Sequence, residues 1–282
     1  MATLGTQYYN NEADTSAKNS FILKDTDMFI MQIGEEGTNG VESESSNDIT
    51  FTPSTAPTTF GTDTYNSTVG LNLLVTGATS TLWYGPVKDT TSTTLVFDCT
   101  TMFNVSSGAA GTASDWASAA TYSWRVHYPS AYGLYGDYFG HVKEISLEPK
   151  EEIIQFKKGV PRELIVQDTL EWSYAIKGKN FTPNAQVFRS VLNGTSYGAQ
   201  TSQTETHFGF APATRAQFKV TLVGQNRAGY DMIWEFFICQ FAAEGSIDFS
   251  AEEYKGLPFT LNVFKDALRG DARNAFRLVQ DS

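Results

Sequence analysis

The sequence predicts a mostly-β fold of the β-sandwich or barrel-like type, with one short helix and a β-rich polar insertion. Residues 164–176 alternate between apolar and polar side chains, which is typical of a strand with one face on a core. Short segments rich in Thr and Val, separated by Gly and Pro, follow one another through the first half of the chain. Only residues 182–194 carry both a start and a stop signal for a helix, so strands must form most of the fold.

The first half of the chain contains several predicted strands. Residues 28–33 form a nearly continuous apolar run closed by Gly34, which suits a strand buried on both faces. Thr and Val supply the β-propensity of four further segments. These predicted strands are residues 69–76, 81–84, 93–97 and 121–128.

The second half is predicted to place strands on either side of the helix. Residues 142–147 and 153–156 are predicted strands, and residues 157–161 form the turn that leads into 164–176. After the helix, two apolar segments are joined by a Gly- and Asn-containing turn, which predicts a hairpin. The hairpin strands are residues 218–222 and 230–243, and a final strand is predicted at 257–264.

The helix is predicted from its two ends. Thr182 can cap the N terminus, and Pro183 stands at the first helical position, where its missing N–H is not needed. Gly194 stands just past the C terminus. Apolar residues between them recur at a spacing of four, which gives one apolar stripe.

Composition excludes several classes of protein. The chain has 282 residues, of which 41% are hydrophobic and 13% aromatic, so it can bury a sizeable core and is not a disordered protein. Its net charge of -11 disfavours tight binding of nucleic acid, which requires a basic surface. With 2 Cys and 3 His, neither a disulfide framework nor a metal site is expected, and no cofactor motif occurs.

No catalytic constellation is found, so the chain is predicted not to be an enzyme. Adjacent acidic pairs, such as Glu151 and Glu152, would point to opposite faces of a strand and would not converge on a substrate. Asp168 lies on the apolar face of residues 164–176. Three interpretations of Asp168 stay open: it is a catalytic acid, it pairs with an Arg or Lys, or it lies where this face leaves the core.

Net charge and amino-acid composition divide the chain into regions. Residues 1–140 contain four basic and fourteen acidic residues, whereas residues 141–282 contain sixteen basic and seventeen acidic residues. The first part is also rich in Ser, Thr and Gly. We expect an N-terminal arm and a C-terminal arm around a main β-domain that carries a peripheral β-rich insertion, dispensable for the fold. The arms are residues 1–20 and 265–282, the main domain 21–35 and 124–264, and the insertion 36–123.

Residues 233–241 are apolar on both faces. Either they form a central strand covered by their own chain, or one face is covered by another subunit. On the second interpretation, Trp234, Phe236 and Phe237 contact a neighbouring copy.

The second half of the chain carries a resemblance to a known family. Its order is a long strand pair, GHVKEISLEPKEEIIQFKKGVPRELIVQDTLEWSYAIKG, a short helix ending in VFRSVLNG, and the hairpin FKVTLVGQNRAGYDMIWEFFICQFAAEGSIDFS, followed by AEEYKGLPFTLNVFKD. This pattern resembles the major tail tube proteins of long-tailed, siphovirus-like bacteriophages over about half of the chain. The resemblance implies a tail-tube β-sandwich whose sheets join side by side into rings, usually of six copies, that stack into a hollow tube for DNA.

The resemblance also implies binding partners and a location for the protein. The protein would be a structural virion component, made in the host cytoplasm without a secretion signal, and it would not contact a membrane. Its partners would be further copies of itself, other tail proteins (the tape measure, the terminator and the baseplate or tip) and genomic DNA in transit without tight binding. An acidic lumen would let DNA slide, because like charges repel.

Particular residues are expected at these contacts. The basic residues Lys157, Lys158 and Arg162 are candidates for contacts between subunits or rings, alongside the aromatic residues of 233–241. Glu171 and Glu235 are candidates for the lumen.

Two further functions stay open at this stage. A carbohydrate-binding or adhesive β-module would use exposed aromatic residues, for which the candidates are Trp83, Tyr84, Trp116 and Trp124. A capsid decoration protein of a virion would show the same absence of catalytic motifs.

Overall fold

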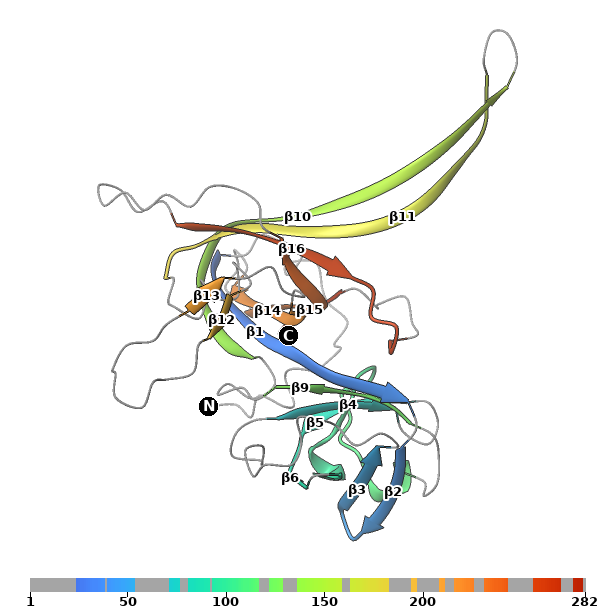
Figure 1. Ribbon diagram of the computed structural model, residues 1–282, viewed down its shortest axis with the longest axis vertical. Helices are drawn as coiled ribbons and strands as arrows, with labels where there is room; N and C mark the ends of the chain where they lie inside the picture. Colours follow the sequence, from blue (N-terminus) through green and yellow to red (C-terminus); the bar gives the residue numbers. More distant parts are fainter. Residues whose placement is uncertain are drawn as a thin grey trace. The chain divides into compact units, whose positions relative to one another are not determined.

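The computed structural model is mostly β, as the sequence predicts (Figure 1). It describes residues 24–38, 40–53, 71–76, 81–91, 93–116, 122–128, 136–158, 163–182, 194–196, 208–210, 216–225, 231–242, 256–269 and 276–280. The chain divides into two compact units. Unit 1 combines Met1–Phe139, Gln217–Ile238 and Asp266–Ser282, and unit 2 combines Gly140–Ala216 and Cys239–Lys265.

Unit 1 contains two antiparallel sheets. The larger sheet has the order β15-β14-β1-β9-β4-β5-β8, and β17 also pairs with β15. Its strands are β1 (Lys24–Thr38), β4 (Asn72–Thr76), β5 (Leu82–Pro86), β8 (Phe103–Asn104), β9 (Ser123–His127), β14 (Phe218–Gln225), β15 (Asp231–Ala242, within unit 1 to Ile238) and β17 (Phe276–Gln280). The smaller sheet has the order β2-β3-β7-β6, from Gly40–Ser45, Asp48–Pro53, Leu95–Asp98 and Asp89–Thr90.

Strand β1 joins two parts of the larger sheet. Its first half pairs with β14, and its second half, from Ile33 to Thr38, pairs with β9 after a shift of register. The apolar run that predicted a buried strand lies in the first half, where Met28, Ile30 and Met31 are buried. The strand is therefore longer than the predicted 28–33, because pairing continues past the apolar run.

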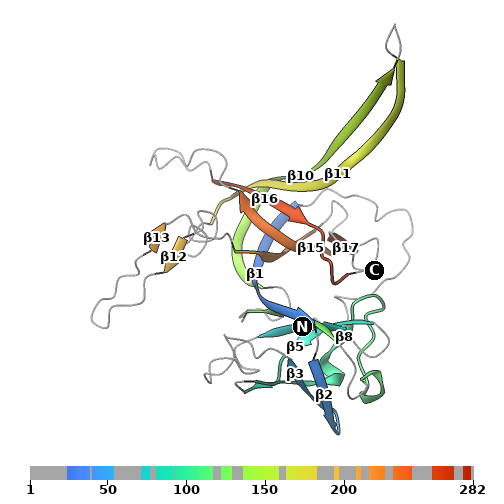
Figure 2. The same cartoon turned by 45° about the vertical axis from the view of Figure 1, so that its right-hand side comes forward.

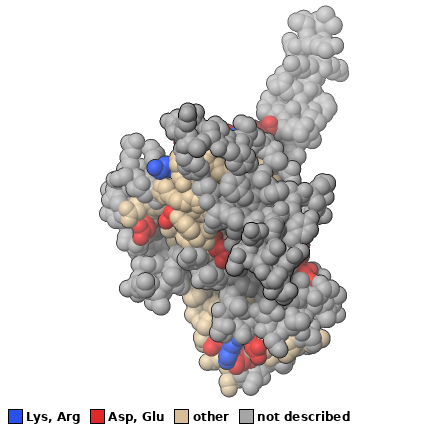
Figure 3. Space-filling model, turned by 60° about the vertical axis from the view of Figure 1, so that its left-hand side comes forward, with Lys and Arg blue, Asp and Glu red and all other residues tan. Residues whose placement is uncertain are grey.

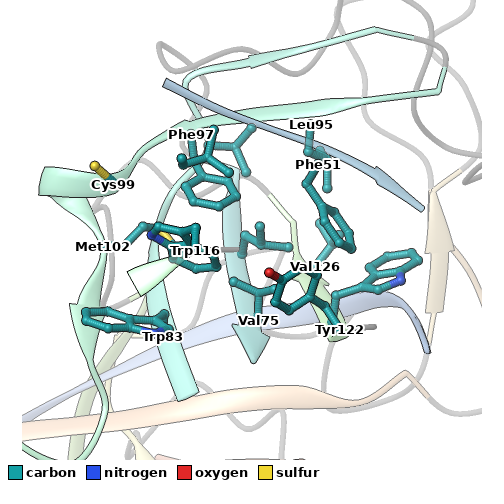
Figure 4. Packing of buried hydrophobic residues seen from close by; sticks show 14 of the residues in the cluster. Phe51, Val75, Trp83, Leu95, Phe97, Cys99, Met102, Trp116, Tyr122 and Val126 are labelled. Carbon is teal, nitrogen blue, oxygen red and sulfur yellow. The ribbon is translucent and has the colours of Figure 1, made fainter. Parts of the chain in front are cut away.

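A large hydrophobic cluster fills the space between strands of the two sheets of unit 1 (Figure 4). Trp116 is central to it: its ring lies 4.8 Å from that of Phe97 and 5.9 Å from that of Trp83, measured between centroids. Two short 3-10 helices lie near these strands in the sequence, η2 (Cys99–Thr101) and η3 (Ala113–Asp115). Phe51, on β3, contacts Tyr122 and Trp124 edge to face.

This cluster corrects the expectation that residues 36–123 form a solvated decoration, whereas their dispensability for the fold stays a prediction. Most of its members come from that stretch and are fully buried. The composition misleads because only every second residue of a strand faces the core. In β7, for example, Leu95 and Phe97 are buried while Val96 and Asp98 are half-buried, so a segment rich in polar residues still completes an apolar face.

Strands β4 and β5 are covered on both faces. Leu73, Val75 and Trp83 face the large cluster, while Leu74 and Tyr84 belong to a second cluster. The partly buried residues of this second cluster are Leu82, Phe103, Val105, Ile233 and Leu268. The insertion therefore packs on residues from β15 and from the C-terminal region, within unit 1.

The short strands predicted in this region are confirmed. Strands β4, β5, β7 and β9 occupy the predicted segments with small shifts of their ends. The predicted arm 1–20 and the predicted helical residues 183–193 lie outside the described residues.

Unit 2 is built around a long hairpin. Strand β10 (Asp137–Lys158, in unit 2 from Gly140) pairs with β11 (Glu163–Asn180), and β11 pairs with β16 (Leu257–Phe264). Strands β12 (Gly194–Ser196) and β13 (Phe208–Phe210) form a separate pair. The two strands predicted at 142–147 and 153–156 are one strand, with a shift of register at Lys143–Ser146.

The hairpin continues past the end of β16 as a two-stranded ribbon (Figure 2). Strand β16 pairs with β11 only from Tyr174 to Asn180, whereas β10 and β11 pair as far as Lys158 and Glu163. Lys157 and Lys158 therefore belong to a strand and not to the predicted turn.

Candidate functional site

The aromatic strand β15 is covered mainly by its own chain. Phe236 and Phe237 are buried, at 2% and 3% exposure, and Trp234 is half-buried and stacked on Phe236 with ring centroids 6.3 Å apart. The guanidinium group of Arg269 lies 3.5 Å from the centroid of the Phe237 ring. Burial within one chain removes the reason for assigning Phe236 and Phe237 to a subunit contact, so the prediction is corrected for these two residues.

Glu235, a predicted lumen residue, is also buried. Its carboxylate lies 2.9 Å from Nζ of Lys219 on β14, and both side chains are at most 3% exposed. The same Nζ lies 4.8 Å from the centroid of the Tyr84 ring. A carboxylate that is buried and paired inside the chain presents no charge to a lumen, which corrects this prediction. Lys219 and Glu235 carry opposite charges within two consecutive, mainly apolar strands, and this pattern in the sequence could have predicted the pair.

A second buried ion pair joins three segments of unit 1. Arg125 on β9 uses Nη2 and Nε toward Glu36 on β1, both at 2.7 Å, and Nη1 toward Asp266 at 2.8 Å. Arg125 and Asp266 are almost fully buried, whereas Glu36 is exposed. Asp266 also accepts a hydrogen bond from the backbone N–H of Leu268 and pairs with Nε of Arg269 at 3.3 Å.

His127 lies among these charges on β9. It is 4% exposed, and the edge of its ring meets Tyr84 with centroids 5.3 Å apart. Burial lowers the pKa of His127 well below its ordinary value, and three cations lower it further: Lys219, Arg125 and Arg269. Its Nδ1 has no hydrogen-bond partner among the residues that the structure describes.

We call this group the buried charge cluster, although Glu36 at its edge is exposed. Its members are Glu36, Arg125, His127, Lys219, Glu235, Asp266 and Arg269. Three cations face three carboxylates, so the cluster is neutral when His127 is neutral. The sequence did not reveal this site, because its members come from β1, β9, β14, β15 and the region after β16.

Part of the arm predicted at 265–282 is attached to unit 1. Asp266 is buried, Leu268 packs on the second hydrophobic cluster, and β17 pairs with β15 from Met232 to Phe236. We call residues 266–269 together with β17 the C-terminal segment. The side chains of Asp266 and Leu268 and the backbone pairing of β17 attach this segment to unit 1.

Three of the remaining predicted site residues, Lys157, Lys158 and Glu171, stand on the two strands of the ribbon. In the backbone register Lys157 is opposite Leu164, Lys158 is opposite Glu163, and Glu152 is opposite Glu171. The side chains of Lys157, Lys158, Asp168 and Glu171 lie outside the described set, as does the whole of Arg162. Their roles stay predictions.

Other chemistry is limited in the described part of the chain. No group of three or more His, Cys, Asp or Glu residues there could hold a metal ion. Cys99 and Cys239 are both buried, and burial raises the pKa of the Cys239 thiol far above its ordinary value. Helices that could cross a bilayer, by length and apolar character, are not found among the described residues.

No protein-family model matches the chain, and no curated protein matches its sequence. The function is therefore inferred from the residues and geometry of the chain itself.

Proposed function

We propose that this protein is a structural virion component that self-assembles into stacked, hexameric rings and so forms a phage tail tube, the conduit for DNA ejection. The resemblance of the second half to tail tube proteins and the mostly-β fold support this proposal. Other tail proteins would join the two ends of such a tube.

The observation that carries the proposal is the β10–β11 ribbon. From residue 150 to residue 158, β10 pairs with β11 alone among the described residues, over a length of about 30 Å at 3.3 Å per residue. A lone two-stranded hairpin is only marginally stable in water, and both of its outer edges carry unpaired backbone groups. A ribbon of this length is therefore suited to packing against another chain, and self-assembly supplies that chain to every copy.

The charges along the ribbon suit a contact between copies. Lys157 and Lys158 stand at the end of β10, the tip of the ribbon, opposite Leu164 and Glu163. The sequence has three basic residues within 157–162, Lys157, Lys158 and Arg162, whereas the whole chain has a net charge of -11. Farther from the tip, Glu152 is opposite Glu171 in the backbone register, beside a shift of register between Glu152 and Ile153. Charge complementarity between the basic tip and an acidic neighbouring copy would set the register of an interface.

DNA transit agrees with the surface charge. On the face drawn in Figure 3, the described acidic and basic side chains are scattered, and they do not gather into a continuous basic patch. Tight DNA binding needs several Lys or Arg contacts with phosphate. Glu171 remains a lumen candidate under this proposal, and Glu235 does not.

The carbohydrate-binding alternative loses the observation that favoured it. Trp83, Tyr84, Trp116 and Trp124 are all buried, at 5% exposure or less, so they are not free to stack on sugar rings.

Electron microscopy of a shortened variant tests the proposal. Glu151 and Trp172 are opposite each other in the register, so an Asn-Gly turn in place of residues 152–171 closes the hairpin at that point. We expect the unchanged chain to form tubes or rings, and the shortened chain to fold, by circular dichroism, without forming them. Lys88→Gln, which changes an exposed residue of unit 1, is the control that should still assemble. Tubes formed by the shortened chain, or an unchanged chain that stays monomeric at high concentration and in intact particles, would contradict the proposal.

A further inference from the structure

The C-terminal segment is attached to unit 1 by the buried charge cluster. Asp266 pairs with Arg125 at 2.8 Å, and Arg269 covers the ring of Phe237. Leu268 adds a contact with the second hydrophobic cluster, and β17 lies along β15. Beyond the backbone pairing of β17, these contacts depend on a few side chains that lie close to His127.

We propose that the buried charge cluster is an acid-sensitive latch, which holds the C-terminal segment on unit 1 at neutral pH and releases it when His127 takes up a proton. This inference does not depend on the proposed function, because it concerns one copy of the chain.

The charge balance of the cluster explains its sensitivity. The groups that face His127 are the Tyr84 ring from β5, Lys219 from β14, Arg125 from β9 itself and Arg269 from the C-terminal segment. Its register partners, Ile33 on β1 and Asn72 on β4, carry no charge. The carboxylates of the cluster are Glu36, Glu235 and Asp266, and each is already paired with a cation. A proton on His127 therefore adds a fourth cation to three carboxylates, at a position that water barely reaches.

The C-terminal segment is the part of the cluster that can leave at least cost. The other members stand on β1, β9, β14 and β15, which are held by long strand pairings and by the hydrophobic clusters. Departure of the C-terminal segment removes one ion pair, one cation–ring contact, one apolar contact and the backbone pairing of β17 with β15. It admits water to the imidazolium, whose solvation then drives the release.

The direction of the pH dependence follows from the lowered pKa. His127 has a pKa below 6.5 while it is covered, and an ordinary pKa of about 6.5 once it is exposed to water. The exposed state binds the proton more tightly, so the latch is at full strength above about pH 6.5. It weakens as the pH falls from there to the pKa of the covered state, and the change is about tenfold per pH unit for one proton.

Hydrogen exchange of the whole chain tests the latch. Backbone amides of residues 266–269 and 276–280 should lose protection as the pH falls below 6.5, after correction for intrinsic exchange, while those of β4 and β9 stay protected. His127→Gln, which cannot take up the proton, should keep the segment protected over the same range. His141→Gln is the matched control, because His141 lies in unit 2, and it should behave as the unchanged chain does. Equal loss of protection in His127→Gln and in the unchanged chain would overturn the proposal.

A measurement on the unchanged chain covers the case in which His127→Gln does not fold. The chain has 3 His, so the imidazole signals can be assigned by NMR with His141→Gln and His207→Gln. Titration of His127 over the same pH range as the release supports the latch. Release of the segment while His127 stays neutral would refute it.

Discussion

Lys219 on β14 and Glu235 on β15 form an ion pair of 2.9 Å in which both side chains are almost fully buried. Each residue stands in a strand that is otherwise mainly apolar: Lys219 is the one charged residue of β14, and Glu235 shares β15 only with Asp231 at its start. The pair is therefore a structural element of unit 1, and removal of one partner should cost more than removal of both.

Glu235→Gln should destabilise the chain by about 3–5 kcal/mol, because Lys219 would remain buried without its counter-charge. The free energy of unfolding in urea measures the loss. The double variant Lys219→Met, Glu235→Leu should recover most of it, since two apolar side chains need no pairing. Lys177→Gln breaks the half-exposed pair with Glu148 and is the control, with an expected loss of at most about 1 kcal/mol. An equal loss in Glu235→Gln and Lys177→Gln would show that burial of the first pair has no energetic weight.

Phe97→Ala should cost about 3–5 kcal/mol, the range for removing a large side chain from a well-packed core. Phe97 is fully buried, and its ring meets Trp116 at 4.8 Å. Phe264→Ala is the matched control, because Phe264 is 41% exposed and should change the unfolding free energy far less. Similar melting temperatures for the two variants would argue against the packing of the large cluster.

Replacement of residues 40–121 by a Gly/Ser linker should abolish cooperative unfolding. The replacement removes β4 and β5, which cover β9 and the second hydrophobic cluster, so it exposes Ile233 and Leu268 as well as the buried charges. Circular dichroism during heating detects the loss of a sharp transition. A sharp transition at an unchanged temperature would instead restore the view that this region is a dispensable decoration.

Lys157→Gln combined with Lys158→Gln should reduce tube formation and leave the fold intact. The two changes remove most of the positive charge at the ribbon tip, and the contact proposed between copies depends on that charge. Light scattering at low and at high salt measures the assembly, which high salt should weaken in the unchanged chain. Assembly that is insensitive to both the substitutions and the salt would exclude an electrostatic contact at the tip.

Duplex DNA should bind only weakly to assembled tubes. A net charge of -11 per copy repels phosphate, with screening beyond about 10 Å at 0.1 M salt. Gel-shift titration at low salt, where phosphate contacts are strongest, is the appropriate measurement. Sub-micromolar affinity would favour a nucleoprotein role over a conduit.

Part of the strand content of this protein could be predicted from local sequence, whereas β2, β3 and β17 were not predicted. Alternation in residues such as Leu95 to Asp98 and the apolar run of β1 depend only on neighbours in the chain, because a strand has a period of two. The predicted strands at 69–76, 81–84, 93–97 and 121–128 are confirmed for this reason. The resemblance of the second half likewise lies in the order of its segments.

Tertiary structure alone decided which of these strands share a core and which charges are buried. Trp116 and Trp124 could be exposed or central on the sequence alone, and only the packing of the two sheets of unit 1 buries them. On the sequence alone Glu235 could face a lumen, and the structure instead pairs it with Lys219. Asp266 could likewise belong to an exposed tail, and the structure pairs it with the buried Arg125. The physical reason is that burial and ion pairing depend on distances between residues far apart in the chain, whereas periodicity depends only on adjacent ones.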